Sequence, residues 1–228
     1  MIGDINAYLG DIEILRADIL AAQERYETAL FNYEDGEEEV KAALMNSRLG
    51  TIDTRTGNYR PAIRYFESTI ETLDGYDNPR RNQALVDSTL ATANLGLGFV
   101  YVEMGLYDQA TPQLSVALNL LVAVDDDFNA AAAQVYLGDV DFAQEDYNGA
   151  SDLYRRAARS AEQVGNFRAQ ALALSGIGAS MVALESDEAL EIQENFEQAL
   201  ALARRILDQD AERRILMTMA ESELRQGN

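Results

Sequence analysis

Small and large apolar residues recur along this chain in a fixed order with a period close to 40 residues. The clearest landmark is a glycine that follows Leu or Ile, and its five copies are separated by 40, 48, 40 and 40 residues. The five copies are Gly10, Gly50, Gly98, Gly138 and Gly178. A small residue follows twelve positions later, at Ala22, Ala62, Ala110 and Ala150, and a large apolar residue follows sixteen positions later, at Tyr26, Phe66, Leu114 and Tyr154. Self-similarity of this length is typical of a stacked array of supersecondary units.

Each repeat is long enough for two helices that are joined by a tight turn. Turn signals such as Gly57-Asn58 and Gly105-Leu106 lie between the landmarks. A small residue at a helix crossing lets two helix axes approach to about 8–10 Å. The glycines and alanines therefore predict the faces on which the paired helices meet, with a first helix of about 14 residues and a second of about 16–18.

These landmarks resemble the tetratricopeptide repeat. The resemblance is clearest in Leu97-Gly98-x-x-Tyr101-x-x-x-Gly105-x-Tyr107-x-x-Ala110. The usual period of that family is about 34 residues, and the longer period here is similar to the repeats of kinesin light chains, G-protein-regulator adaptors and bacterial quorum-peptide sensors. The resemblance implies an all-α fold, a right-handed α-solenoid of about five helical hairpins followed by a C-terminal capping helix.

Polar connections divide the chain into five units and a terminal helix. The predicted units are 1–36, 43–74, 79–125, 128–165 and 168–208, and the cap helix covers 211–226. Because each unit of such an array contacts only its neighbours, we predict one structural domain over 1–228. The 48-residue interval contains an insertion near Asp77-Asn78-Pro79, which predicts that the first helix of the third unit starts at the proline and is about two turns longer.

The charge of the chain narrows the range of partners. There are 39 acidic and 18 basic residues, which gives a net charge of −21, and no Lys or Arg occurs between Asn82 and Tyr154. Nucleic acid is therefore not expected as a partner, because phosphate binding depends on Lys and Arg. Anionic membrane surfaces are disfavoured for the same reason.

Lysine is almost absent, with Lys41 as its one copy. Together with the acidic surplus, this is similar to the composition of proteins from high-salt cytoplasms, in which case added potassium chloride should stabilise the fold by screening self-repulsion. The alternative is a GC-rich genome that favours Arg, with acidic helices kept soluble by repulsion.

The sequence gives few signals of compartment. There is no Cys, the N-terminus lacks the basic region and apolar core of a signal peptide, and no uninterrupted apolar run reaches the ~20 residues of a membrane span. We therefore expect a cytoplasmic protein without membrane insertion. The first unit begins almost at Met1 without a capping segment, which leaves it open to self-association or to docking against something larger.

The composition lacks the residue types that most catalytic and metal sites use. The absence of both His and Cys excludes Ser-His and Cys-His nucleophile pairs and imidazole or thiolate metal sites. The acidic clusters Glu34–Glu39 and Asp125–Asp127 lack the alternating spacing of a calcium loop and favour solvated turns with helix caps. We predict that the protein is not an enzyme and has no cofactor or metal.

The surface most suited to binding lies on the first helix of each unit. Residues three before, one after and four after the glycine share one helix face, and in the tetratricopeptide family that face lines a concave groove. The candidate binding residues on or beside it are Arg48, Thr51, Arg55, Phe99, Tyr136, Asp139 and Phe142. This set predicts an aromatic anchor for an apolar part of a partner and a basic end for an acidic or polar part.

The aromatic residues of this face have a second interpretation. Phe99 and Phe142 could instead pack in the core against the second helix of a neighbouring unit. The family's carboxylate clamp for chaperone tails is a separate case, since it requires Lys and Asn at set groove positions. Those positions carry Ala7, Asp11, Ser47 and Thr51, so chaperone-tail binding is not expected.

Two functions fit these observations. The first is a non-catalytic scaffold or adaptor that holds a peptide or a helix of a partner protein in its groove. The alternative is a regulatory sensor segment of a larger signalling ATPase or transcription regulator, in which the array closes on a peptide or small ligand. The identity of the partner is open in both.

Overall fold

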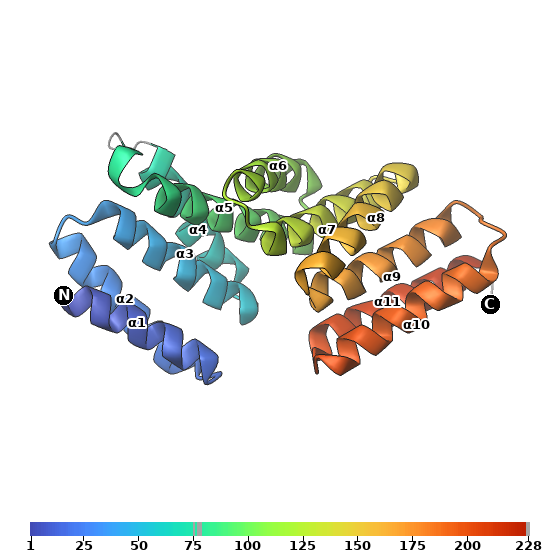
Figure 1. Cartoon of the computed structure of the whole chain (residues 1–228), viewed down its shortest axis with the longest axis horizontal. Coiled ribbons are helices and arrows are strands. Elements are labelled where there is room, and N and C mark those ends of the chain that lie inside the picture. The colour runs from blue at the N-terminus through green and yellow to red at the C-terminus, as the bar shows by residue number, and fades with distance from the viewer. Residues whose placement is uncertain (75, 77–78, 227–228) are drawn as a thin grey trace. The chain divides into compact units, whose positions relative to one another are not determined.

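The computed structural model describes residues 1–74, 76 and 79–226, and over these residues it contains eleven α-helices and no strand (Figure 1). The helices are α1 (Ile2–Leu15), α2 (Ile19–Asp35), α3 (Glu39–Arg55), α4 (Tyr59–Asp74), α5 (Pro79–Glu103), α6 (Tyr107–Ala123), α7 (Asp127–Ala143), α8 (Tyr147–Val164), α9 (Phe167–Ala183), α10 (Ala189–Arg205) and α11 (Gln209–Gln226). Odd-numbered and even-numbered helices alternate as the first and second helices of hairpins. The prediction of an all-α array of hairpins followed by a C-terminal helix is confirmed.

The chain separates into two compact units, Met1–Leu120 and Leu121–Asn228. The first unit contains α1 to α5 and most of α6, and the second contains α7 to α11. Within the first unit α3 packs against α2, α4 and α5, and within the second α9 packs against α7, α8, α10 and α11. Each unit is described by itself, and the single domain expected over 1–228 stays a prediction.

Four of the five repeated glycines lie against an aromatic ring, and Gly98 lies against the Leu114 side chain. A Cβ atom placed on Gly50 would lie 2.7 Å from the Phe66 ring, and one placed on Gly96 of the next first helix would lie 2.4 Å from the same ring. Phe66 is therefore held between α3 and α5, and it is fully buried. The space left by the missing side chain at Gly50 is filled by the large residue sixteen positions later.

The longer first helix of the third repeat is present. Helix α5 has 25 residues, whereas α3, α7 and α9 have 17 each, so the eight-residue insertion extends the helix by about two turns. It starts at Pro79, as predicted. The Asp77-Asn78 pair that was expected to precede this start lies outside the described residues.

Most of the inter-helix turns contain one residue in the left-handed region. Gly165 has φ 71° and ends α8 as expected, but the corresponding residue is Glu145 before α8 and Leu207 before α11. A side chain with a Cβ atom is strained there by roughly 1–2 kcal/mol. Most turns of this array therefore accept local strain that Gly57, Gly105 and Gly165 avoid.

Replacing Leu207 by Gly is expected to raise the free energy of unfolding by about 0.5–1 kcal/mol. Leu207 has φ 57° and an exposed side chain, so the change relieves backbone strain and removes no core contact. Urea unfolding followed by circular dichroism measures the difference. Leu190→Gly is the matched control, because this leucine is similarly exposed but lies within helix α10, where glycine should destabilise.

Helix α11 occupies the place of a first helix in a sixth repeat. Asp208 accepts a hydrogen bond from the Ala211 amide at its start, as Asp126 does for α7 and Asn166 for α9. This register places Arg213 where the earlier first helices carry an alanine that is at most 1% exposed. Those alanines are Ala43, Ala91, Ala131 and Ala171.

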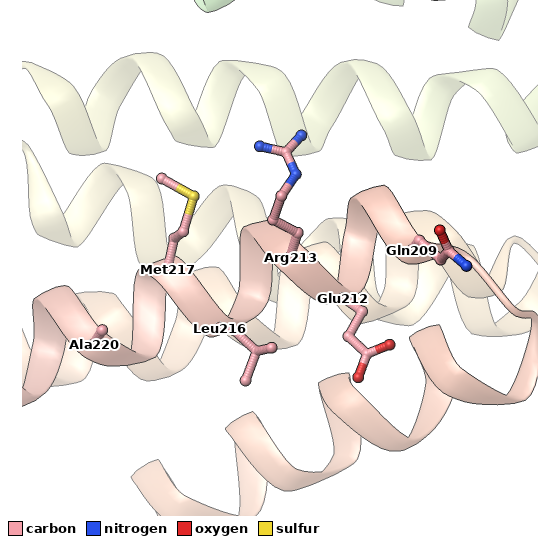
Figure 2. Close-up of a pocket in the computed structure, with 6 residues that line it drawn as sticks. All are labelled: Gln209, Glu212, Arg213, Leu216, Met217 and Ala220. Atoms are coloured by element: carbon pink, nitrogen blue, oxygen red, sulfur yellow. The ribbon is translucent and has the colours of Figure 1, made fainter.

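Arginine at this position adds a charge to an outer face of α11 that also exposes Leu216 and Met217. In Figure 2 Arg213 and Met217 extend from one side of α11, and Glu212 and Leu216 extend from the other. The shallow depression along this face is lined by α11 residues alone. A guanidinium here replaces the small residue that close packing of a further helix would need.

One helical segment of the described part, Gln83–Glu103, is long and apolar enough to cross a membrane by length and composition alone. Its mean hydropathy is 1.3, and 50% of its most apolar window is buried inside the protein. The core helix of a globular array meets the same criterion. Gly96 and Gly98 of this segment lie against the side chains of Phe66 and Leu114, so its inner face belongs to the core.

Candidate binding surface

The predicted binding residues of the first unit lie on α3 and α5, and they differ in exposure. Thr51 and Arg55 are exposed, Arg48 is half-buried, and Phe99 is half-buried on α5. Thr51 donates a hydrogen bond from its hydroxyl to the Ser47 carbonyl at 3.0 Å. Phe99 is therefore neither a free surface anchor nor a fully buried core residue.

Part of the predicted binding face is buried. Residues three before the repeated glycine were expected to line the groove, but Ser47, Val135 and Ser175 are only 1–3% exposed. The hydroxyl oxygens of Ser47 and Ser175 have no hydrogen-bond partner among the described residues. In α3 the accessible strip is thus formed by residues after the glycine, such as Thr51 and Arg55.

Arg48 does not offer a free positive charge. Its guanidinium lies 3.0 Å from a carboxylate oxygen of Asp11 on α1 and stacks over the Tyr26 ring of α2, 5.3 Å from the ring centroid. The Tyr26 hydroxyl donates to the same carboxylate at 2.8 Å. An Asp, a Tyr and an Arg from three successive helices thus form one cluster, and Asp11 neutralises the cation that was expected to attract an anionic partner.

The same cluster is repeated two helical turns away. Lys41 lies 2.8 Å from the Asp4 carboxylate and 5.2 Å from the centroid of the Tyr33 ring, and the Tyr33 hydroxyl donates to Asp4 at 3.2 Å. Each member is separated by seven residues from its counterpart in the first cluster. Because seven residues are close to two turns of an α-helix, the two clusters lie along one seam.

These contacts shift the titration of their members. The hydrogen bond from Lys41 lowers the pKa of the Asp4 carboxyl well below its usual range. Burial, followed by the charge of Asp4, raises the pKa of Tyr33 to about 12, and burial followed by the hydrogen bond to Asp11 raises the pKa of Tyr26 further. The Asp4 carboxylate is therefore ionised and both phenols are neutral at neutral pH.

The second unit contains a related cluster around Asp139. The Tyr154 hydroxyl donates to the Asp139 carboxylate at 2.8 Å, and the guanidinium of Arg214 on α11 forms an ion pair with the same group. Burial, together with the Asp139 charge, raises the pKa of Tyr154 well above its ordinary value. Tyr136 is half-buried and lies near Arg214. Asp139 is thus satisfied within the unit.

Phe142 belongs to an aromatic pair that α11 covers. Its ring makes an edge-to-face contact with Tyr147, with centroids 5.2 Å apart. The Arg225 guanidinium lies 5.6 Å from the Phe142 centroid and donates a hydrogen bond to the Tyr147 hydroxyl at 3.2 Å. Phe142 also packs at the margin of the core of this unit, which combines the two interpretations that the sequence left open.

The sequence model of the tetratricopeptide repeat family matches residues 89–163. That stretch contains the Leu97-Gly98 and Leu137-Gly138 landmarks whose packing is described above. Over this stretch, about a third of the chain, the sequence is similar to tetratricopeptide repeats. No curated protein sequence matches it.

Solved structures with tetratricopeptide-like repeats share this fold. A Rap protein complexed with competence and sporulation factor is 16% identical with a TM-score of 0.69, and the match covers 97% of this chain and 64% of the Rap protein. The Rap conjugation gene regulator of plasmid pLS20, in complex with the Phr* peptide, is 17% identical with a TM-score of 0.68, over 92% of this chain and 55% of the regulator. BtubC from P. vanneervenii is 15% identical with a TM-score of 0.69, over 91% of this chain and 83% of BtubC. At these identities the likeness concerns the fold.

The repeat spacing contains a signal for the Tyr–Asp pair of each cluster, but not for the cation that joins it. Tyr26 and Tyr154 occupy the same repeat position, sixteen after the glycine, and Asp11 and Asp139 both follow the glycine directly. This shared spacing was a readable signal for the Tyr–Asp pair. The cation could not be predicted from the spacing, because Arg48 comes from α3 in the first unit and Arg214 comes from α11 in the second.

Acidic side chains at helix starts act as caps. Asp126 accepts a hydrogen bond from the Asn129 amide at 3.1 Å, which supports the interpretation of Asp125–Asp127 as a capping turn. Glu38 precedes α3 without a side-chain cap bond, so that interpretation does not extend to the Glu34–Glu39 cluster. Over 1–74, 76 and 79–226, no three Asp or Glu side chains are grouped to hold a metal ion.

Proposed function

We propose that this protein is a non-catalytic scaffold that binds a peptide or a helix of a partner protein along the first helices of its repeats. The observation that carries the proposal is the accessible strip of α3 and α5, where exposed Thr51 and Arg55 and half-buried Phe99 lie on first helices of a tetratricopeptide array. Arrays of this kind present an extended surface for binding. One of the structures that share the fold is in complex with the Phr* peptide, and another is complexed with competence and sporulation factor.

The charges of the first unit refine the expected partner. Arg48 is paired with Asp11, whereas Arg55 is exposed in the last turn of α3. An acidic or polar group of the partner is therefore proposed to contact Arg55, and an apolar group to contact Phe99. Arg and aromatic residues are the types that most often dominate binding energy at interfaces.

Selection from a random-peptide display library tests this proposal directly. Peptides that are enriched on the full chain should bind Arg55→Glu and Phe99→Ala variants at least about tenfold more weakly, a loss of roughly 1.4 kcal/mol for each. Binding is measured by fluorescence anisotropy with the selected peptides. Melting temperatures of all variants are compared by circular dichroism, because Phe99 is half-buried.

Matched controls lie on the second helices of the same unit. Arg60→Glu on α4 makes the same charge change at an exposed arginine, and Phe31→Ala on α2 removes an exposed phenylalanine. Both should leave peptide affinity unchanged. Failure to enrich any peptide, or binding lost in the controls but kept in the α3 and α5 variants, would show that the first helices are not the binding surface.

A sensor segment is the second candidate function. Its specific support is that two of the similar structures are a Rap protein complexed with competence and sporulation factor and a Rap regulator in complex with the Phr* peptide. The matches cover 64% and 55% of those two chains. In that case a bound peptide should change the arrangement of the repeats. Small-angle scattering of the chain with and without a selected peptide distinguishes the candidates, since a passive scaffold keeps its radius of gyration and a sensor contracts.

A further inference from the structure

We propose that the outer face of α1 pairs with the same face of a second copy of this chain in an antiparallel, two-fold contact. Helix α1 packs against α2, and the side opposite this contact is apolar. Ile5, Tyr8 and Leu15 on that side are 54%, 68% and 87% exposed. The inference is independent of the proposed peptide binding, which uses α3 and α5.

The apolar residues of α1 form one continuous stripe. At 100° per residue they fall within a single sector of the helix, opposite the buried Gly3, Asn6 and Gly10. The complete stripe is Ile2, Ile5, Tyr8, Leu9, Ile12 and Leu15. Four of these residues are separated by three, four and three positions, which is the spacing of a helix-pairing seam. They are Ile2, Ile5, Leu9 and Ile12.

The stripe reads the same in both directions. Its members are placed symmetrically about the midpoint between Tyr8 and Leu9, so an antiparallel copy brings every apolar residue opposite another apolar residue. The facing pairs are Ile2 with Leu15, Ile5 with Ile12, and Tyr8 with Leu9. A surface that complements itself in this way is what a two-fold contact between identical chains requires.

Charge also favours a second copy at this face. The chain as a whole carries −21, so most surfaces of two copies repel each other. All three carboxylates of α1 are ion-paired, however, with Asp4 to Lys41, Asp11 to Arg48 and Glu13 to Arg16. The seam clusters described above thus give α1 a locally neutral surface in an otherwise strongly acidic protein.

The size of the face sets the strength of the contact. A 14-residue helix is about 21 Å long, and two such helices bury less than the roughly 1,600 Å² of a standard stable interface. The dimer is therefore weak, and it forms between micromolar and millimolar concentrations. Raising the concentration of potassium chloride strengthens it, because the remaining charge of each copy is screened.

Sedimentation velocity of the full chain over that concentration range tests the proposal. The weight-average mass should rise from 25.2 kDa towards twice that value. Ile5→Lys and Leu15→Lys should each weaken the dimer by about tenfold or more, because each dimer would bury two unpaired ammonium groups. Leu190→Lys is the control and should not change the dimer, because Leu190 is an exposed leucine on α10 whose exposure lies between those of Ile5 and Leu15.

A charge complement tests the pairing itself. Ile5→Lys alone and Ile12→Glu alone should both dimerise about tenfold or more weakly than the parent, whereas their equimolar mixture should form a tighter dimer in which one Lys–Glu pair replaces one Ile–Ile pair. Circular dichroism melts confirm that each variant is folded. A parent that stays monomeric throughout, a dimer that Ile5→Lys and Leu15→Lys leave intact, or a mixture that fails to associate would each overturn the proposal.

Discussion

Replacing Gly138 by Leu is expected to lower the free energy of unfolding of the second unit by about 3 kcal/mol, at the upper end of the range for overpacked cores. A Cβ atom at this position lies 2.7 Å from the Tyr154 ring, which is only 3% exposed. The ring cannot retreat, because Gly176 of α9 closes its other side with a Cβ position 2.5 Å away. Moving the ring would also break the hydrogen bond from Tyr154 to Asp139.

Gly178→Ala is the matched control for this prediction. It adds a Cβ atom to a helical glycine of the same repeat position, but the nearest Phe196 atom is 3.0 Å away and a small shift of the ring relieves the contact. Urea unfolding of the full chain, followed by circular dichroism, measures both variants. Equal stability of Gly138→Leu and the parent would show that the ring is not held between the two glycines.

Replacing Arg214 by Met is expected to destabilise the second unit by about 2 kcal/mol. The value lies between those for buried and exposed ion pairs, because 33% of the Arg214 side chain and 14% of the Asp139 side chain are exposed. Met keeps most of the aliphatic stem and removes the guanidinium. The Asp139 carboxylate is then left with the Tyr154 hydroxyl as its remaining hydrogen-bond donor among those described here.

A double-mutant cycle isolates the contribution of the ion pair. Asp139→Asn removes the charge and retains a side-chain carbonyl that can accept from Tyr154. If the pair holds α11 in place, the double variant should be more stable than the sum of the single changes predicts, by about 1 kcal/mol or more. Arg213→Met, at the exposed neighbouring position, should have no effect. Strict additivity of the two changes would contradict a direct interaction.

The repeat pattern predicted the helices because it is a local property of the chain. The five glycines, the small residue twelve positions later and the large residue sixteen positions later were sufficient to place the hairpins and the C-terminal helix. The insertion before Gly98 likewise predicted the longer α5. A periodic pattern of this kind predicts helices well because each helix must bury one defined face against its neighbours.

The sequence placed the candidate binding residues on the correct helices but could not determine their surroundings. Arg48 and Asp139 were read as open to a partner, whereas each is ion-paired to a residue of another helix. The residue three before the glycine was read as part of the groove, and at Ser47 it is buried. The angle between neighbouring helices sets these outcomes, and that angle has no signature at single positions.

By itself, the sequence determined the fold class, the order of the helices, the length of the second helices and the exclusion of His and Cys chemistry, since these follow from composition and from contacts that repeat every 40 residues. The expected length of the first helices was too short, because α3, α7 and α9 have 17 residues and not about 14. Only the tertiary structure decided which charges are free. The partner of Asp11 is 37 residues away and that of Asp139 is 75 residues away. An ion pair depends on distances of a few ångströms between side chains, and packing of whole helices against one another sets those distances.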